Sequence, residues 1–149
     1  MSNSIQIRPA DKRDLQGVNE LEQRCFPGHC YPDFFFRQAL DCWPGGFLVA
    51  GDDEDTTQGY LLAAPGADTH LCWILSVAVC ESLRGKGIGR KLLTQFLSRL
   101  PSSVSRVQLT VAPDNSAKAL YLDLGFVQTG YEADYFGESE PRLLLTYVK

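Results

Sequence analysis

The chain has 149 residues, of which 44% are hydrophobic and 21% charged, and its net charge is −4 at pH 7. This length and composition predict a single globular domain over residues 1–149. The acidic balance argues against non-specific nucleic-acid binding, and no apolar run approaches the ~18 residues of a membrane-spanning helix. We therefore expect a protein that binds neither nucleic acid nor membrane.

The N-terminus and the cysteines indicate the compartment. The first residues lack the charged-then-apolar layout of a secretory signal. The five cysteines form an odd set without C-x-x-C spacing, which is typical of thiols in a reducing compartment rather than of disulfides or a zinc site. We therefore expect a cytoplasmic protein without a bound metal. The cysteines are Cys25, Cys30, Cys42, Cys72 and Cys80.

Helix and strand patterns alternate along the first half of the chain. Asp11 as a cap, followed by apolar residues at i, i+3 and i+4, predicts a helix over residues 11–25. Pro32, a residue type favoured at the first helical position, predicts a second helix over 33–42. Short apolar runs predict strands over 5–8, 47–50 and 60–63, with a polar hairpin turn over 52–57.

The second half alternates in the same way. Pro113 ends one predicted strand, and Gly125 ends the last predicted helix in the left-handed conformation. The expected order is a strand at 71–79, a helix at 89–100, a strand at 106–111, a helix at 115–124, and a hairpin of strands at 127–135 and 142–148. Together these elements predict an α/β fold whose mixed sheet carries helices on both faces.

Three alternating glycines stand between the long strand and the helix that follows it. Gly85, Gly87 and Gly89 leave no Cβ atom to block an approach to the backbone. Backbone N–H groups at the start of a helix, together with the helix dipole, favour a bound phosphate. Lys86 and Arg90 add positive charge at the same place. The segment therefore predicts a pyrophosphate site, and a solvated turn is the alternative.

Two common phosphate loops do not fit this spacing. A dinucleotide fingerprint needs G-x-G-x-x-G, whereas Leu92 stands three residues after Gly89, and a P-loop needs Gly-Lys followed by Ser or Thr. Arg84, Gly87 and Gly89 instead form R-x-x-G-x-G, which resembles the loop of the GNAT superfamily of acetyl-coenzyme A-dependent N-acetyltransferases. In that family the loop binds the coenzyme A (CoA) pyrophosphate through backbone amides.

A second motif supports the resemblance. Tyr121, Gly125 and Phe126 belong to a Leu-Tyr-x-x-Leu-Gly-Phe run that is similar to the GNAT signature in which the tyrosine hydroxyl lies beside the thioester sulfur. The resemblance implies that Tyr121 is the general acid that protonates the departing thiolate, and a core tyrosine is the alternative. It also implies the GNAT acyl-CoA N-acyltransferase fold, with a central, mixed and mostly antiparallel sheet.

The resemblance further implies acetyl-CoA as the acyl donor. Backbone amides near Val77 and Val79 are then expected to bond the pantetheine arm and the acetyl carbonyl. The family places an asparagine seven residues before the tyrosine, whereas Asn115 lies six before Tyr121. We expect Asn115 to contact pantetheine, with Asp114 as the alternative. The expected CoA-binding residues are Val77, Ala78, Val79, Arg84, Gly85, Lys86, Gly87, Ile88, Gly89, Arg90, Asn115 and Tyr121.

The general base departs from the family pattern. Relatives that acetylate ribosomal proteins carry a glutamate where this chain has Thr110, and histone-type members carry one where it has Trp73. Neither side chain accepts a proton usefully. His70 is our candidate for the base, acting directly or through water, and His29 is a weaker candidate. A water chain to backbone carbonyls is the alternative.

Acidic and aromatic residues near the C-terminus indicate a cationic acceptor. Tyr131, Tyr135 and Phe136 resemble the tyrosine-bearing hairpin that peptide N-terminal acetyltransferases lay over their substrate. With the aromatic segment before the second helix, the expected substrate-binding residues are Tyr31, Phe34 and Tyr135. A solvated surface hairpin is the alternative. The acidic residues are Glu132, Asp134, Glu138 and Glu140.

These observations predict an N-acetyltransferase that transfers the acetyl group of acetyl-CoA to a primary amine by direct attack in a ternary complex. We expect the acceptor to be a protein or peptide N-terminal α-amine. One alternative acceptor is a small amine such as a polyamine, metabolite or drug, and another reading is a non-catalytic acyl-CoA-binding module. The sequence is compatible with a monomer and with a homodimer.

Overall fold

The computed structural model describes residues 5–52 and 56–149. Part of the polar turn predicted over 52–57 therefore lies outside the described residues. The chain groups into two compact units. The first contains Met1–Ala64 and Ser76–Arg99, and the second contains Pro65–Leu75 and Leu100–Lys149. That the whole chain acts as one domain stays a prediction.

The described strands follow the order β1-β2-β3-β4-β5-β7-β6. Strand β4 belongs to both units, because its first residues pair in parallel with β5 in the second unit and its last residues belong to the first unit. The pairs β1–β2, β2–β3, β5–β7 and β6–β7 are antiparallel. The mixed, mostly antiparallel sheet is therefore confirmed. The strands are β1 (Gln6–Pro9), β2 (Phe47–Gly51), β3 (Thr57–Pro65), β4 (Leu71–Val79), β5 (Arg106–Val111), β6 (Val127–Glu132) and β7 (Arg142–Val148).

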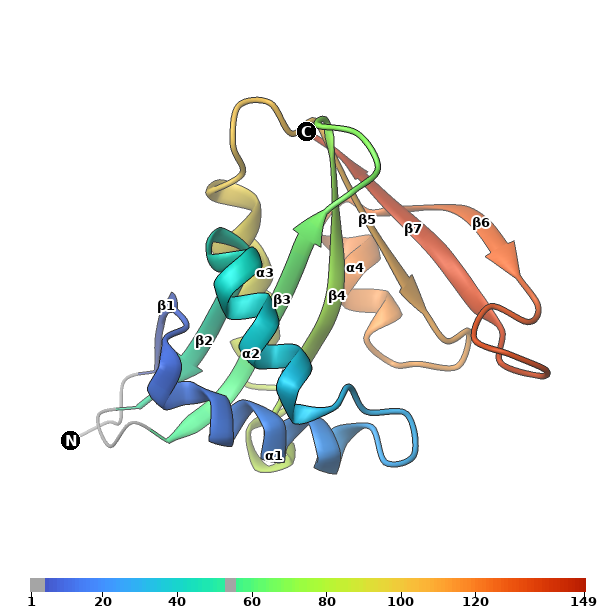
Figure 1. Ribbon diagram of the computed structural model, residues 1–149. Coiled ribbons are helices and arrows are strands. Elements are labelled where there is room, and N and C mark those ends of the chain that lie inside the picture. The colour runs from blue at the N-terminus through green and yellow to red at the C-terminus, as the bar shows by residue number, and fades with distance from the viewer. Residues whose placement is uncertain (1–4, 53–55) are drawn as a thin grey trace. The chain divides into compact units, whose positions relative to one another are not determined.

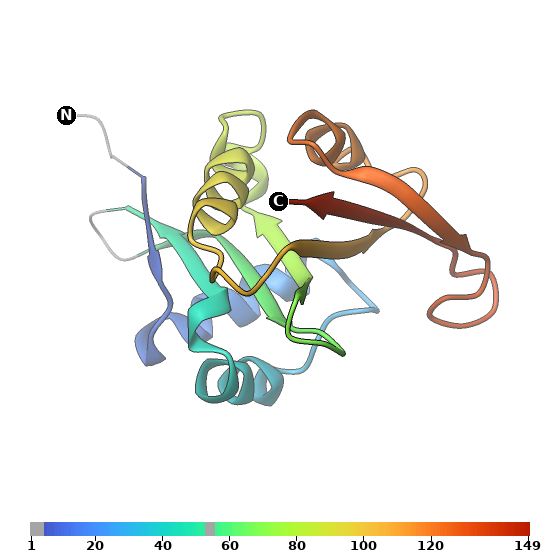
Figure 2. The same cartoon turned by 90° about the horizontal axis from the view of Figure 1, so that it is seen from above.

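Helices cover both faces of the strands in the first unit. Figures 1 and 2 show α1 (Leu15–Cys25) and α2 (Asp33–Cys42) on one face of β2 and β3, and α3 (Ile88–Ser98) on the other. Successive strand residues point to opposite faces, so the apolar residues of β2 and the buried run at 59–64 of β3 contribute to two cores. The core on the α1/α2 side contains Val18, Leu21, Phe36, Ala39, Phe47, Val49, Tyr60, Leu62 and Ala78.

In the second unit, α4 (Lys118–Asp123) lies over β5, β6 and β7 (Figure 2). Its Tyr121 ring contacts Phe126 edge-on at 5.8 Å, and Phe126 in turn lies 5.5 Å from the Tyr147 ring of β7. Gly125 adopts φ +106°, and the Phe126 N–H donates to the Tyr121 carbonyl. The predicted left-handed glycine therefore ends this helix.

Most predicted elements are present with shifted ends. The helix over 33–42 and the strands over 71–79, 106–111 and 142–148 are confirmed to the residue. The helix predicted over 11–25 begins with a 3-10 turn at 12–14, and the helix predicted over 115–124 begins only at Lys118. The reason for the late start is a local turn, because the Asn115 carboxamide oxygen accepts the Ala117 N–H at 2.8 Å. The other elements have the bounds given above. The structure also contains 3-10 turns at 44–46 and 81–83.

A buried acidic residue fixes the start of α1 in the first unit. The Asp14 carboxylate accepts the Asp11 N–H at 2.8 Å and two hydrogen bonds of 2.7 Å from the Arg8 guanidinium. Burial by itself raises the pKa of Asp14, but the hydrogen bonds from Arg8 and the Asp11 backbone outweigh it and hold the pKa below its ordinary value. The ion pair therefore stabilises the fold only where Asp14 is ionised. No helix among residues 5–52 and 56–149 is long and apolar enough to cross a membrane.

Replacing Arg8 by methionine removes this partner and leaves the buried Asp14 charge uncompensated. We expect the free energy of unfolding at pH 7 to fall by about 2 kcal/mol, below the ~3–5 kcal/mol of a fully buried pair because Arg8 is partly exposed. Because the pKa of Asp14 is lowered, this contribution is fully present above about pH 4, and it is lost as the pH falls below that value through the lowered pKa. Urea unfolding at pH 7 and pH 3 measures it. A difference between the two proteins that does not shrink at pH 3 would contradict the account.

Candidate functional site

The predicted glycine loop joins the end of β4 to α3 within the first unit. Gly85 and Gly87 adopt φ +82° and +85°, the left-handed region that side chains other than glycine rarely occupy. A Cβ atom added at either position would meet no atom within 4 Å. Backbone conformation rather than packing therefore requires glycine here, and the space beside both residues is open to a ligand.

Gly87 is also the N-cap residue of α3. The first helical hydrogen bond runs from the Lys91 N–H to the Gly87 carbonyl at 3.0 Å. The amides of Ile88 and Gly89 lie in the first turn, where a helix supplies no backbone acceptor. These amides and the positive end of the helix dipole suit an anion, and Lys86 lies exposed in the same loop. The loop fits the pyrophosphate of CoA.

The motif arginine braces the end of β4. Arg84 donates from Nε to the Val79 carbonyl at 3.3 Å and from Nη2 to the Cys25 sulfur at 3.4 Å. Val77 and Val79 are half-buried and alternate with the buried Ser76 and Ala78, so they lie on the opposite face of the strand. Arg84 thus links the C-terminal end of α1 to the end of the strand that carries the predicted acetyl-binding amides.

Tyr121 lies in α4 of the second unit. Its side chain is buried, and burial raises the pKa of Tyr121 to about 12. The hydroxyl is therefore protonated at neutral pH, as a general acid must be. The ring contact with Phe126 shows that this residue also contributes to the packing of the second unit.

Asn115 and Asp114 both precede α4. The Asn115 N–H donates to the Ala112 carbonyl at 3.0 Å, and its side-chain oxygen is engaged by the Ala117 N–H. The turn uses the backbone N–H and the side-chain oxygen of Asn115, which leaves its side-chain NH2 group to donate to a ligand. Asp114 is exposed. Since neither residue is helical, a spacing of six or seven residues does not decide between them.

His70 lies just before β4, at the end of the strand away from the glycine loop. Its ring is exposed, and Nδ1 lies 2.9 Å from the Ser103 carbonyl oxygen. A carbonyl oxygen only accepts, so Nδ1 carries the proton of the neutral ring and Nε2 keeps its lone pair. The ring is thus held in a form that can accept a proton at Nε2. Trp73 and Thr110 are half-buried strand residues of the same unit.

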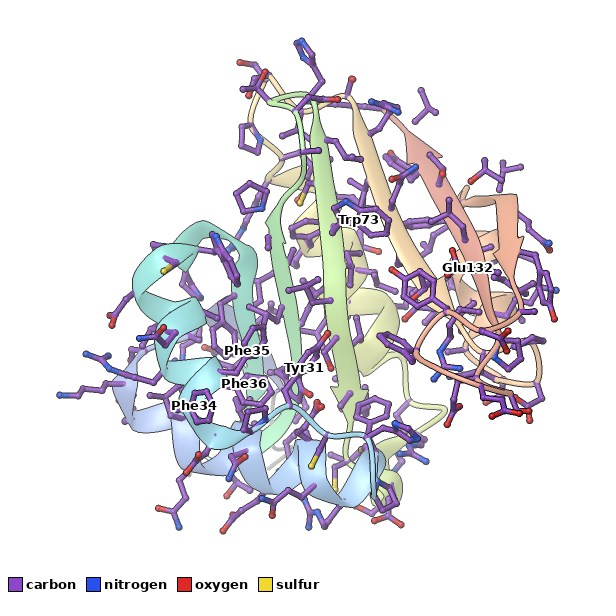
Figure 3. All side chains as sticks on the ribbon, turned by 45° about the vertical axis from the view of Figure 1, so that its right-hand side comes forward. Tyr31, Phe34, Phe35, Phe36, Trp73 and Glu132 are labelled. Carbon is purple, nitrogen blue, oxygen red and sulfur yellow. The ribbon has the colours of Figure 1, made fainter. Side chains whose placement is uncertain are left out.

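The aromatic residues at the start of α2 are arranged in two ways (Figure 3). Tyr31 stacks on Phe35 with ring centroids 4.5 Å apart and meets Phe36 edge-on at 6.3 Å. Phe36 is fully buried, whereas Phe34 is 68% exposed. Tyr31 therefore belongs to a packed aromatic group that anchors the loop before α2, whereas Phe34 projects into solvent.

The segment between β6 and β7 carries the second aromatic group, in the second unit. Tyr135 and Phe136 meet edge-on at 4.7 Å, and the Arg142 guanidinium lies 4.9 Å over the Phe136 ring. Arg142 also lies 3.8 Å from the Glu140 carboxylate, so part of the acidic charge is compensated. The Asp134 carboxylate accepts the Ser139 N–H within the turn. Glu132 ends β6 nearby (Figure 3).

Sequence reasoning missed the role of one buried residue. Glu22 lies within the helix predicted over 11–25, and the sequence assigned it no function, yet its carboxyl group is buried and accepts hydrogen bonds from Tyr60, Ser76 and the Tyr31 backbone. The signal was a charged residue type inside an apolar stripe, which is unusual for a core position.

Comparisons with known proteins agree with these features. A profile of the Acetyltransferase (GNAT) family matches residues 15–126. The N-terminal acetyltransferase complex ARD1 subunit homolog of Dictyostelium discoideum is 30% identical over 97% of this chain and 74% of its own length. The N-alpha-acetyltransferase RimI of Mycobacterium tuberculosis is 29% identical over 89% of this chain and 84% of its own. The L-2,4-diaminobutyric acid acetyltransferase of Halomonas elongata is 27% identical over 74% of this chain, which spans only 59% of that relative.

A solved structure gives the same fold. Ard1 from Thermoplasma volcanium superposes with a TM-score of 0.88 at 24% identity, covering 97% of both chains. At this identity the likeness establishes the fold, and the sequence comparisons establish the family.

The matched range includes both the glycine loop and the segment around Tyr121. It therefore spans the two motifs on which the resemblance rested, and the open, amide-lined loop suits the donor that the family uses. The chain belongs to the GNAT family and is an acetyl-CoA-dependent N-acetyltransferase.

Proposed function

We propose that this N-acetyltransferase acetylates the α-amine of a protein or peptide N-terminus. The observation that carries the proposal is the match, over 97% and 89% of this chain, to two relatives whose names specify N-terminal or N-alpha acetylation. The exposed aromatic side chain of Phe34 in the first unit supports it, and so does that of Tyr135 in the second, because each offers an apolar surface suited to a peptide. The diaminobutyric acid acetyltransferase relative favours the small-amine alternative over a shorter part of the chain.

The roles of the chain's own groups follow from what acetyl transfer requires. Acetyl-CoA supplies the activated acetyl group. The amides of the 85–89 loop and of α3 hold its pyrophosphate, with Lys86 and Arg90 adding charge, and Asn115 contacts its pantetheine arm. The backbone amides near Val77 and Val79 stabilise charge on the acetyl oxygen. Tyr121, which burial keeps protonated, donates its proton to the departing sulfur.

The acceptor amine must lose a proton before or during attack. We propose His70 as the acceptor of that proton, because the Ser103 carbonyl holds the ring in the suitable tautomer. Since His70 precedes the first residue of β4 whereas Val77 and Val79 lie at its other end, the proton reaches Nε2 through a chain of several waters. Proton loss to water and backbone carbonyls is the competing route.

Peptides with free and blocked N-termini test the acceptor. Each peptide carries one internal lysine, and the matched control is the same peptide with a formylated α-amine; L-2,4-diaminobutyric acid is the small-amine probe. We expect CoA release and a mass increase at the first residue with the free peptides only. Transfer to diaminobutyric acid or to the lysine side chain, without transfer to the α-amine of any peptide, would contradict the proposed acceptor.

Gly87→Val tests the pyrophosphate loop. A β-branched residue is strained at φ +85° and places atoms in the space that the phosphates need, so we expect CoA affinity to fall at least ~10-fold. Gly28→Val is the matched control, since Gly28 has φ +86° and equally open surroundings but lies outside the loop. Isothermal titration with CoA measures both. Equal affinities of the two variants would remove the pyrophosphate role.

Tyr121→Phe tests the general acid. We expect kcat to fall about 10²-fold, the usual contribution of acid catalysis, while the CoA dissociation constant changes less than about 2-fold. Because the pKa of Tyr121 is raised to about 12, the wild-type kcat should show no loss from its ionisation up to about pH 10. Tyr147→Phe, a neighbour in the same ring cluster, is the control. A wild-type kcat in Tyr121→Phe would assign the residue to packing.

His70→Ala tests the proposed base. We expect kcat/KM to fall about 10²-fold with CoA affinity preserved, because only proton removal is affected. His29→Ala, which removes the chain's other histidine, should retain activity within about 3-fold. If kcat/KM falls by less than about 3-fold in His70→Ala, water rather than His70 accepts the proton.

A further inference from the structure

A carboxyl group lies inside the apolar core of the first unit. Glu22, in the last turn of α1, is 1% exposed, and the neighbouring core residues include Val18, Leu21 and Phe36. Burying an acidic group among such residues costs free energy unless hydrogen bonds replace its water. Apolar residues of similar size commonly stabilise a core equally well or better. Stability alone therefore does not explain this residue.

Three uncharged donors replace that water. The Tyr60 hydroxyl donates to Glu22 Oε1, the Ser76 hydroxyl donates to the same oxygen at 3.1 Å, and the Tyr31 N–H donates to Oε2 at 2.9 Å. The Tyr60 and Ser76 hydroxyls lie 2.9 Å apart, which closes the group. Burial, followed by the charge of Glu22, raises the pKa of Tyr60 far above its ordinary value. Tyr60 therefore remains a donor at every pH at which the protein works.

The donors come from three different parts of the first unit. Tyr60 lies in β3, Ser76 lies in β4, and Tyr31 lies in the loop between α1 and α2. Ser76 directly precedes Val77, whose backbone is proposed to bind the acetyl group. Tyr31 anchors the aromatic group from which Phe34 projects toward solvent. The Glu22 carboxyl group thus connects the loop between α1 and α2 to β4, the strand on which the acetyl group is proposed to lie.

We propose that Glu22 is a positioning residue that fixes the loop at 26–32 against β4, so that an acceptor amine held by the loop meets the acetyl carbonyl. The inference rests on the proposed function for the identity of the acceptor, but the tether itself is a property of the fold. The oxygen that binds the loop amide is distinct from the oxygen that binds the two strand hydroxyls. Both oxygens are therefore needed for the link, and a side chain with one acceptor performs it only in part.

Glu22→Met and Glu22→Gln, in the full chain, test the tether. Met fills the same volume and accepts no hydrogen bond of comparable strength, whereas Gln retains one oxygen for the Tyr31 amide. The matched control is Asp14→Asn, which alters another buried carboxylate of the first unit that contacts Arg8 and Asp11 rather than the loop. Each variant is characterised by thermal melting, hydrogen exchange over residues 26–34, and kinetics with an acceptor peptide and acetyl-CoA.

In Glu22→Met we expect the Tyr31 amide to exchange at least ~10-fold faster and the acceptor KM to rise about 10-fold, with the CoA dissociation constant within about 2-fold of wild type. Glu22→Gln should fall between wild type and Met in both readouts, and it serves alone if the Met variant does not fold. Asp14→Asn should lower the melting temperature with exchange at 26–34 and the acceptor KM unchanged.

Two results would overturn the proposal. Unchanged exchange at 26–34 in the Glu22 variants would remove the tether, and faster exchange with an unchanged acceptor KM would remove its link to the acceptor. If the wild-type protein acetylates no peptide or amine, the proposed function fails by itself, and the exchange measurement still decides whether Glu22 holds the loop.

Discussion

The conformation of two glycines in the loop between β4 and α3 is the constraint on which the donor site depends. Positive φ angles at Gly85 and Gly87 turn the chain from an extended strand into a helix within a few residues. The first amides of α3 have no backbone acceptor within the helix, and the space beside Gly85 and Gly87 is open. Arg84 stabilises the chain before this turn by donating hydrogen bonds to the Val79 carbonyl and the Cys25 sulfur. A phosphate site made of backbone needs no particular side chain, which explains why glycine spacing is its main sequence signal.

Two buried carboxyl groups in the first unit show different uses of the same chemistry. Asp14 is paired with the Arg8 guanidinium and caps the start of α1, so its hydrogen bonds stabilise one local junction. Glu22 instead gathers neutral donors from two strands and a loop. The first arrangement is a structural ion pair. The second connects the loop at 26–32, which we propose to hold the acceptor, to β4, on which we propose that the acetyl group lies.

The sequence predicted regular elements and local motifs well, because both depend on neighbouring residues. The 33–42 helix and the glycine loop follow from Pro32 and from the spacing of the glycines. The late start of α4 depended on a hydrogen bond between Asn115 and Ala117, which competes with the helix and is invisible to periodicity. The Glu22 group was missed because its members are separated by 38 and 54 residues, so only the fold brings them together. The contacts of Arg142 with Glu140 and Phe136 were not predicted either, because neither the charge pattern nor the spacing indicates them.

A thermal-shift titration with acetyl-CoA, CoA and ATP tests most directly the claim that the glycine loop is a CoA pyrophosphate site. A ligand that binds only the folded state adds roughly 2.7 kcal/mol of stability at 100 times its dissociation constant, which is readily measured. The account predicts that acetyl-CoA and CoA both raise the melting temperature, that ATP does not, and that the shift is clearly smaller in Gly87→Val but not in Gly28→Val. An equal shift with ATP, or no shift with either form of CoA, would contradict it.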